Sequence, residues 1–131
     1  MLTMSIDDLA YQVIGAAFTV HNELGSGFLE KVYENAMIVE LQELGFEVKA
    51  QHHIPVYYKG EQVGDYYADL FVENQLIVEL KASLQLHPIH ETQLVNYLQG
   101  TGLDTGLLIN FGLKVVHKRK YRTYRPPNSS S

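Results

Sequence analysis

Apolar residues recur at helical spacing in the first third of the chain. The first such pattern covers residues 6–24, with Ser5 as a favourable N-cap and two aspartates in the first turn. Gly25 and Gly27 then end this helix. A second helical pattern runs from about residue 28 to residue 44, and Gly45 follows as a C′ glycine. The chain is therefore predicted to begin with two consecutive helices.

The remainder is mostly β in pattern. The expected strands cover residues 46–53, 54–58, 62–72, 75–82 and 105–110. Residues 113–117 also fit the pattern of a strand. Pro55 marks either a break or an edge position. A helix over 89–100, opened by Pro88, separates two of the strands, and this crossover predicts a parallel pair. The predicted fold class is α/β (α+β), with helices packed on a mixed sheet.

Composition narrows the class of protein. The chain has 131 residues, 46% of them hydrophobic and 19% charged, which predicts one globular domain over 1–125. The segment 126–131 is rich in Pro and Ser and is predicted to be a disordered tail. The absence of cysteine excludes disulfides and thiolate metal sites. No apolar run is long enough for a membrane span and no signal-peptide pattern appears, so a cytoplasmic location without membrane contact is expected.

The net charge of -5 hides a basic end. Six of the ten basic residues lie between residues 114 and 125, and no acidic residue follows Asp104. Such a segment can contact phosphates, whereas the alternative is a solvated charged terminus. Composition alone leaves both open.

Three charged residues interrupt the apolar strands. In the strand 75–82, Glu79 and Lys81 share one face while the residues between and beside them point to the other. Asp69 lies in the preceding strand. Charges in apolar strands are costly unless they are paired, hydrated or bound to a metal. When this charge pattern is considered without other motifs, a surface ion pair between Glu79 and Lys81 is its simplest explanation.

A second explanation gives these residues a chemical role. If Asp69 and Glu79 face the same way on neighbouring strands, their carboxylates converge and repel unless a cation lies between them. Oxygen ligands of this kind suit Mg²⁺ or Mn²⁺ better than Zn²⁺. Lys81 would then hold a water molecule or stabilise negative charge on a phosphate. Two acids, a metal and a lysine together describe phosphodiester hydrolysis.

Longer motifs favour the chemical explanation. Asp69, a hairpin and Glu79-Leu80-Lys81 resemble the signature of the PD-(D/E)XK nuclease superfamily, although Ala68 stands where that signature has proline. The segment Gly27-Phe28-Leu29-Glu30-Lys31-Val32-Tyr33 matches the motif that names the GxxExxY proteins, a branch of that superfamily. Segments 21–25, 58–60, 93–98 and 106–112 are similar to the same branch, so the resemblance covers residues 6–118.

The resemblance implies a restriction-endonuclease-like core of helix, three strands, helix and strand. It implies Asp69, Glu79 and the backbone carbonyl of Leu80 as metal ligands, with Lys81, Glu30 and Gln93 as catalytic residues. Residues expected to contact the substrate are His21, Tyr33, Tyr97, Lys114, Lys118 and Arg119. Simpler alternatives remain for some: a helix-dipole role for Glu30 and His21, and a helix surface pair for Gln93 and Tyr97.

The functional hypothesis is a nuclease dependent on Mg²⁺ or Mn²⁺ that acts on nucleic acid, with DNA as the expected substrate. The main alternative is a non-catalytic binding or assembly module with the nuclease fold. A third hypothesis is a zinc hydrolase that uses His87 and His90, for which no third ligand is evident. A homodimer is left open, because many such nucleases cut both strands as dimers.

Overall fold

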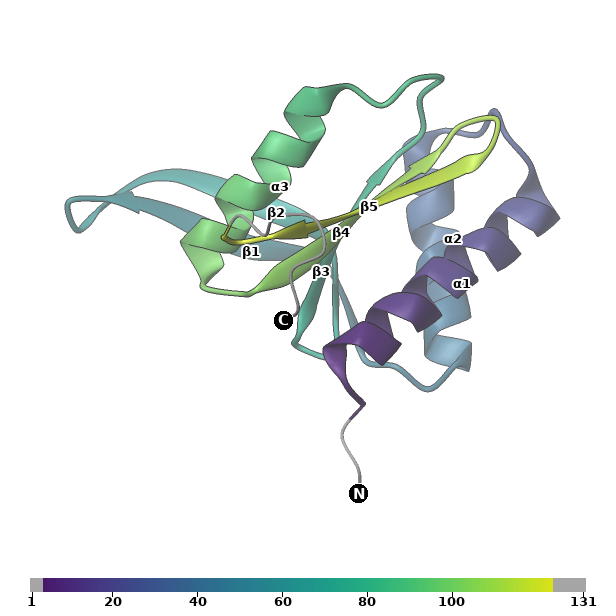
Figure 1. Cartoon of the computed structure of the whole chain (residues 1–131), viewed down its shortest axis with the longest axis horizontal. Coiled ribbons are helices and arrows are strands. Elements are labelled where there is room, and N and C mark those ends of the chain that lie inside the picture. The colour runs from purple at the N-terminus through teal and green to yellow at the C-terminus, as the bar shows by residue number, and fades with distance from the viewer. Residues whose placement is uncertain (1–3, 124–131) are drawn as a thin grey trace.

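A mixed sheet with helices on both faces organises the chain (Figure 1). The computed structural model describes residues 4–123, so Arg125 and the predicted tail at 126–131 lie outside the described residues. The elements are α1 (Ile6–Leu24), α2 (Glu30–Glu43), β1 (Val48–Tyr58), β2 (Glu61–Val72), β3 (Leu76–Lys81), α3 (Pro88–Thr101), β4 (Thr105–Phe111) and β5 (Val115–Tyr121). The fold class is α+β and agrees with a restriction-endonuclease-like core, as predicted.

The sheet has the order β1-β2-β3-β4-β5. β3 and β4 are parallel because α3 makes the crossover between them, and the other neighbours are antiparallel. The predicted helix between these strands and their predicted parallel pairing are both confirmed. The segment 46–58, predicted as one or two strands, contains the single edge strand β1, which begins at Val48 and tolerates Pro55. The last strand continues to Tyr121, so much of the basic end belongs to the sheet.

Two apolar cores lie on opposite faces of the sheet. The first joins α1 and α2 to the sheet and includes Leu9, Val13, Ala17, Tyr33, Met37, Leu41, Leu70, Val78, Leu80 and Ile109. The second lies under α3 and includes Ile54, Phe71, Ile77, Leu94, Leu98 and Leu108. Val78 and Leu80 therefore face α1 and α2 while Ile77 faces α3, which confirms the predicted alternation along this strand.

Helix ends follow the local sequence. The backbone N–H of Asp8 donates to Ser5 Oγ at 3.1 Å, so Ser5 is the N-cap of α1. Gly45 follows α2 with φ 91°, a backbone conformation that favours glycine. None of the helices within residues 4–123 is long and apolar enough to cross a membrane.

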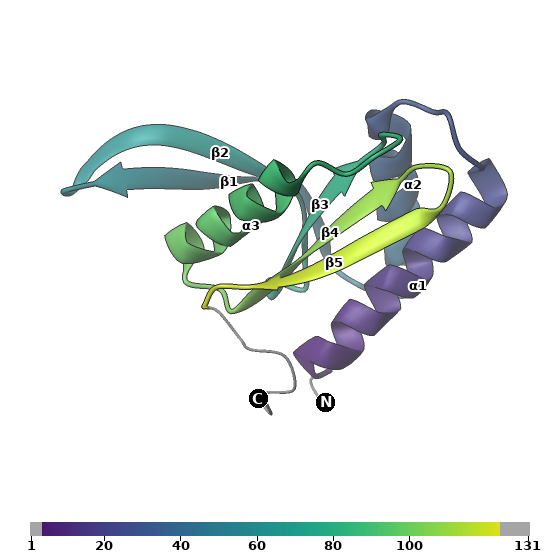
Figure 2. The same ribbon diagram turned by 45° about the horizontal axis from the view of Figure 1, so that its top comes forward.

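The β1–β2 hairpin extends beyond the other strands (Figure 2). β1 and β2 pair from Val48 to Tyr58, but β2 pairs with β3 only from Leu70 to Val72. The hairpin therefore continues as a two-stranded arm after β2 and β3 part. The point of separation falls at Asp69 on β2 and Glu79 on β3.

Candidate active site

Two carboxylates replace the strand ladder where β2 and β3 part. The last paired residues are Leu70 and Val78. Beyond them the backbone N–H of Asp69 donates to Glu79 Oε1 at 3.0 Å, and the N–H of Leu80 donates to Asp69 Oδ2 at 2.8 Å. Each acid thus satisfies a backbone donor that the diverging strands would leave unpaired. This exchange holds Asp69 and Glu79 beside each other.

Burial disfavours the charged forms of Asp69 and Glu79. Glu79 is only 8% exposed. Its burial, and then the neighbouring carboxylate of Asp69, raise its pKa to about 8. Burial also raises the pKa of Asp69, against the hydrogen bond from the Leu80 N–H, which lowers it. Both acids therefore favour a proton or a nearby cation.

Lys81 is the ammonium that this cluster shares. Its charge lowers the pKa of Glu79, Asp69 and Glu30 alike, although it is not the largest influence on any of them. Glu30 is the first residue of α2, and burial raises its pKa, with further contributions from Asp69 and Glu34. The structure thus brings four predicted residues, Glu30, Asp69, Glu79 and Lys81, into one charged cluster.

Glu34 and Gln51 join this cluster, and neither was predicted. Glu34 is 4% exposed, and its Oε2 accepts from Lys31 Nζ at 2.6 Å. Gln51 Nε2 donates to Glu34 Oε1 at 2.6 Å and to Asp69 Oδ1 at 3.4 Å. Glu34 follows Glu30 by one helical turn, a spacing that could have indicated it. Gln51 gave no such signal.

Two tyrosines line the α3 side of the cluster. The rings of Tyr66 and Tyr97 stack, and burial, then the charge of Glu79, raises the pKa of both. The Tyr66 hydroxyl is buried beside Glu79, and this hydroxyl lowers the pKa of the acid against the effect of burial. Gln93 lies one turn before Tyr97 on α3 and is exposed, and its side chain makes no hydrogen bond to the described part of the chain. Tyr97 thus lies near the acids, and no contact joins Gln93 to them.

The structure corrects the expectation for Tyr33. This side chain is fully buried, its hydroxyl donates to the Gly25 carbonyl at 2.6 Å, and its ring stacks on Phe111 at 4.5 Å. It cannot contact a substrate and instead fixes the loop between α1 and α2. His21 has a related position: its Nε2 lies 2.9 Å from the Gly112 carbonyl and its ring stacks on Phe111. It ties α1 to the β4–β5 turn.

Three loops enclose a cleft of about 420 Å³ at the edge of the cluster. The lining residues are 26–30, 82–84 and 111–113, so Glu30 belongs to both the cleft and the charged cluster. Asn110 fixes one wall, because its side chain accepts from the Ser83 N–H at 3.0 Å and donates to the Ser83 carbonyl at 2.9 Å. In the sequence, Asn110 stands out only as part of the segment 106–112.

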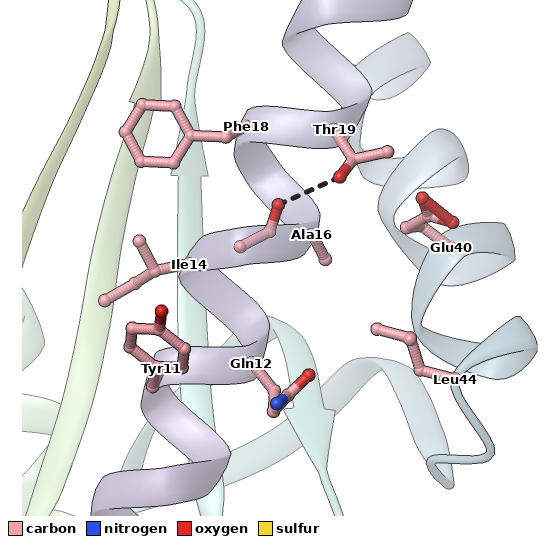
Figure 3. A pocket seen from close by; sticks show the side chains of 9 residues that line it. Tyr11, Gln12, Ile14, Ala16, Phe18, Thr19, Glu40 and Leu44 are labelled. Carbon is pink, nitrogen blue, oxygen red and sulfur yellow. Dashed lines mark hydrogen bonds between the residues drawn. The ribbon is translucent and has the colours of Figure 1, made fainter.

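A second hollow, of about 430 Å³, lies over α1 and α2 (Figure 3). Gln12 and Ala16 of α1 face Glu40 of α2 and its C-cap Leu44 there. Glu40 is the single ionisable acid in its lining, and Thr19 is occupied by a hydrogen bond to the Gly15 carbonyl at 3.2 Å. This hollow offers no cluster of reactive groups.

Ion pairs neutralise much of the basic strand. Arg119 pairs with Asp7 at 2.8 Å, Lys120 with Glu91 at 3.2 Å and Arg122 with Asp104 at 3.0 Å. The Arg119 guanidinium thus lies at the start of α1, and contact of this residue with a substrate stays a prediction. Lys114 and Lys118 are exposed and form no ion pair within residues 4–123.

The donor atoms bear on the kind of metal the protein could hold. Within residues 4–123 no three His, Asp or Glu side chains are grouped as a metal site, so His87 and His90 gain no third ligand. His87 instead caps α3, with Nδ1 accepting from the Ile89 N–H at 3.1 Å. Asp69 and Glu79 supply two oxygen donors whose raised pKa values a hard divalent cation would offset, so the pair fits such an ion.

Comparisons with known proteins give one family and one fold. A family model described as "PD-(D/E)XK nuclease superfamily" matches residues 7–123. The crystal structure of SSO0001 superposes with a TM-score of 0.56 at 16% sequence identity, over 70% of this chain and 50% of that one. This likeness shows the fold, and this chain spans about half the length of SSO0001. No curated protein matches the sequence.

Proposed function

The chain belongs to the PD-(D/E)XK nuclease superfamily, and we propose that it hydrolyses phosphodiester bonds of DNA with Mg²⁺ or Mn²⁺ as cofactor. The observation that carries the proposal is the Asp69–Glu79 pair at the point where β2 and β3 part, with Lys81 beside it. A buried acid such as Glu79, whose pKa is raised further by the neighbouring Asp69, is unfavourable for stability alone, which is typical of a functional site.

Membership of the GxxExxY branch is part of this proposal. Each residue that names the motif has a distinct place in this chain. Gly27 has φ 100°, which favours glycine, and Tyr33 is buried with its hydroxyl on the Gly25 carbonyl. Glu30 begins α2 within reach of the Lys81 and Asp69 charges. The motif would therefore build one wall of the active site.

The proposed chemistry assigns a role to each group. Asp69, Glu79 and the Leu80 carbonyl would hold the cation. When bound, such an ion lowers the pKa of water and polarises phosphate oxygens. Lys81 would orient the attacking water and stabilise negative charge as it develops on the phosphate. Glu30 would orient water from the opposite side of the cleft, and Gln93 would assist from α3.

The substrate backbone would be contacted by the exposed cations near the cleft. Lys114 follows the β4–β5 turn that lines the cleft, and Lys118 lies exposed further along β5. Their ammonium groups are available for phosphates, unlike those held in ion pairs elsewhere on β5. Tyr97 would contact the substrate from the α3 side.

The test is a cleavage assay on plasmid DNA, single-stranded DNA and RNA, with Mg²⁺ or Mn²⁺. We expect Glu79→Gln and Lys81→Met each to reduce the rate by about 100-fold or more. Lys59→Met is the matched control, because Lys59 lies in the turn at the far end of the β1–β2 arm. Equal rates for wild type and both site variants would refute the assignment.

One observation favours the alternative of a non-catalytic module. The ion pairs of Arg119 and Lys120 on β5, and of Arg122 just after it, leave few cations in this segment for a nucleic-acid backbone. Calorimetric titration with Mn²⁺ separates the two functions. Binding that is lost in Asp69→Asn and Glu79→Gln supports the nuclease, whereas no binding at millimolar Mn²⁺ supports the module.

A further inference from the structure

We propose that Gln51 is a positioning residue that directs Asp69 Oδ1 toward the bound cation, with Glu34 as its anchor. The inference rests on the proposed function, since it concerns the same site. It goes beyond that function by giving a role to a residue of the edge strand β1, which contributes no predicted ligand. The argument depends on the backbone of Gln51, its hydrogen bonds and the unequal environments of the two Asp69 oxygens.

The backbone of Gln51 is unusual for a strand. It has φ 51°, in the left-handed region that residues with a side chain seldom adopt. The β1–β2 ladder pairs Ala50 with Leu70 and His52 with Ala68, and omits the intervening pair of Gln51 and Asp69. An unfavourable conformation directly opposite an acid of the site indicates that the position of this side chain matters.

The side chain of Gln51 links two acids. Its Nε2 donates to Glu34 Oε1 at 2.6 Å and to Asp69 Oδ1 at 3.4 Å. Both partners are acceptors, so the amide must present its NH₂ group to them. Lys31 holds the other oxygen of Glu34 at 2.6 Å. The Glu34 carboxylate is thereby fixed on both sides and in turn fixes the amide of Gln51.

The two oxygens of Asp69 are consequently not equivalent. Oδ2 accepts a hydrogen bond from the Leu80 N–H at 2.8 Å, whereas Oδ1 has the longer contact from Gln51 at 3.4 Å. Oδ1 is therefore the oxygen more available to a cation, and the Gln51 amide limits its rotation. Loss of a residue that orients a metal ligand typically weakens metal binding by about 10–100-fold.

The experiment compares Gln51→Gly with Lys59→Gly. Both positions have positive φ, 51° and 49°, so glycine relieves the backbone equally, while only the first change removes a donor from Asp69. Mn²⁺ affinity is measured by calorimetry. Without metal, hydrogen exchange of the Leu80 N–H reports the position of Asp69, and the Ser83 N–H, bonded to Asn110, is the reference.

We expect Gln51→Gly to weaken Mn²⁺ binding by about 10–100-fold and to accelerate exchange at Leu80 but not at Ser83. Lys59→Gly should match wild type in both. Gln51→Glu, which keeps the shape and removes the donor, should also accelerate exchange at Leu80. Wild-type affinity and exchange in Gln51→Gly would overturn the inference and leave the proposed nuclease standing. Absence of Mn²⁺ binding by wild type would overturn both.

Discussion

Replacing Glu79 by glutamine should stabilise the protein at alkaline pH while removing its proposed cation site. Glutamine has nearly the same shape, and its Oε1 can still accept the hydrogen bond from the Asp69 N–H, which measures 3.0 Å. The substitution removes a buried negative charge next to Asp69. It therefore retains the connection between β2 and β3 and eliminates the repulsion.

The magnitude follows from the pKa of Glu79. Burial and Asp69 raise this pKa from 4.5 to about 8. Since each tenfold change in proton affinity is worth about 1.4 kcal/mol, the charged form costs the fold at most about 5 kcal/mol. A raised pKa means that the folded state binds more protons than the unfolded state between pH 4.5 and about 8. The contribution of protonated Glu79 to the free energy of unfolding is therefore fully present below pH 4.5 and is lost as pH rises to about 8.

Urea unfolding of metal-free protein between pH 5 and pH 9 measures this effect. The wild-type free energy of unfolding should fall across that range more steeply than that of Glu79→Gln, and the variant should be the more stable protein at pH 9. Glu61→Gln, an exposed substitution at the far end of the β1–β2 arm, should follow wild type. A Glu79→Gln protein that is less stable than wild type at pH 9 would refute the reasoning.

Three other predictions concern neighbouring groups. Lys81→Met should raise the pH at which Mn²⁺ binding is half-maximal in calorimetry, because the ammonium lowers the pKa of the acids around it; an unchanged pH midpoint would contradict this. Gly112→Ala should lower the free energy of unfolding by about 1–3 kcal/mol in thermal melts, since a Cβ would lie 2.8 Å from the Ser83 carbonyl oxygen. Gly15→Ala is the control and should not destabilise the protein, because a Cβ at Gly15 meets no atom within 4 Å. Tyr33→Phe should cost about 1 kcal/mol in urea unfolding through loss of the 2.6 Å hydrogen bond to the Gly25 carbonyl, and a neutral effect would argue against that bond.

Much of the architecture was predictable because local patterns and the crossover rule agree. Helical spacing and capping residues located α1 and α2, and the helix between two apolar strands required a parallel pair. The place of Glu79 and Lys81 on one face of β3 followed from strand alternation. That Asp69 lies beside Glu79 was predictable only on the condition that the two strands are neighbours.

The remainder depends on contacts between distant segments. Gln51 joins the cluster through a positive φ that its sequence neighbours do not encode. The spacing from Glu30 places Glu34 on the same side of α2, but its hydrogen bond to Gln51 depends on β1 packing beside α2. The ion pair of Arg119 was not predictable, because a sequence does not show that Asp7, over a hundred positions earlier, lies beside it. Tyr33 illustrates a different difficulty, because a motif residue can serve the loop that supports a site and never reach the substrate.

The β1–β2 arm has a practical consequence. Its outer part is held by a single ladder that ends at the Tyr58–Glu61 pair, and Lys59 and Gly60 at its tip pack against neither core. The cost of closing a longer loop grows slowly with its length, so extra residues inserted at this tip should leave the fold intact. A fluorescent label or an affinity tag could therefore be attached there without touching the acids.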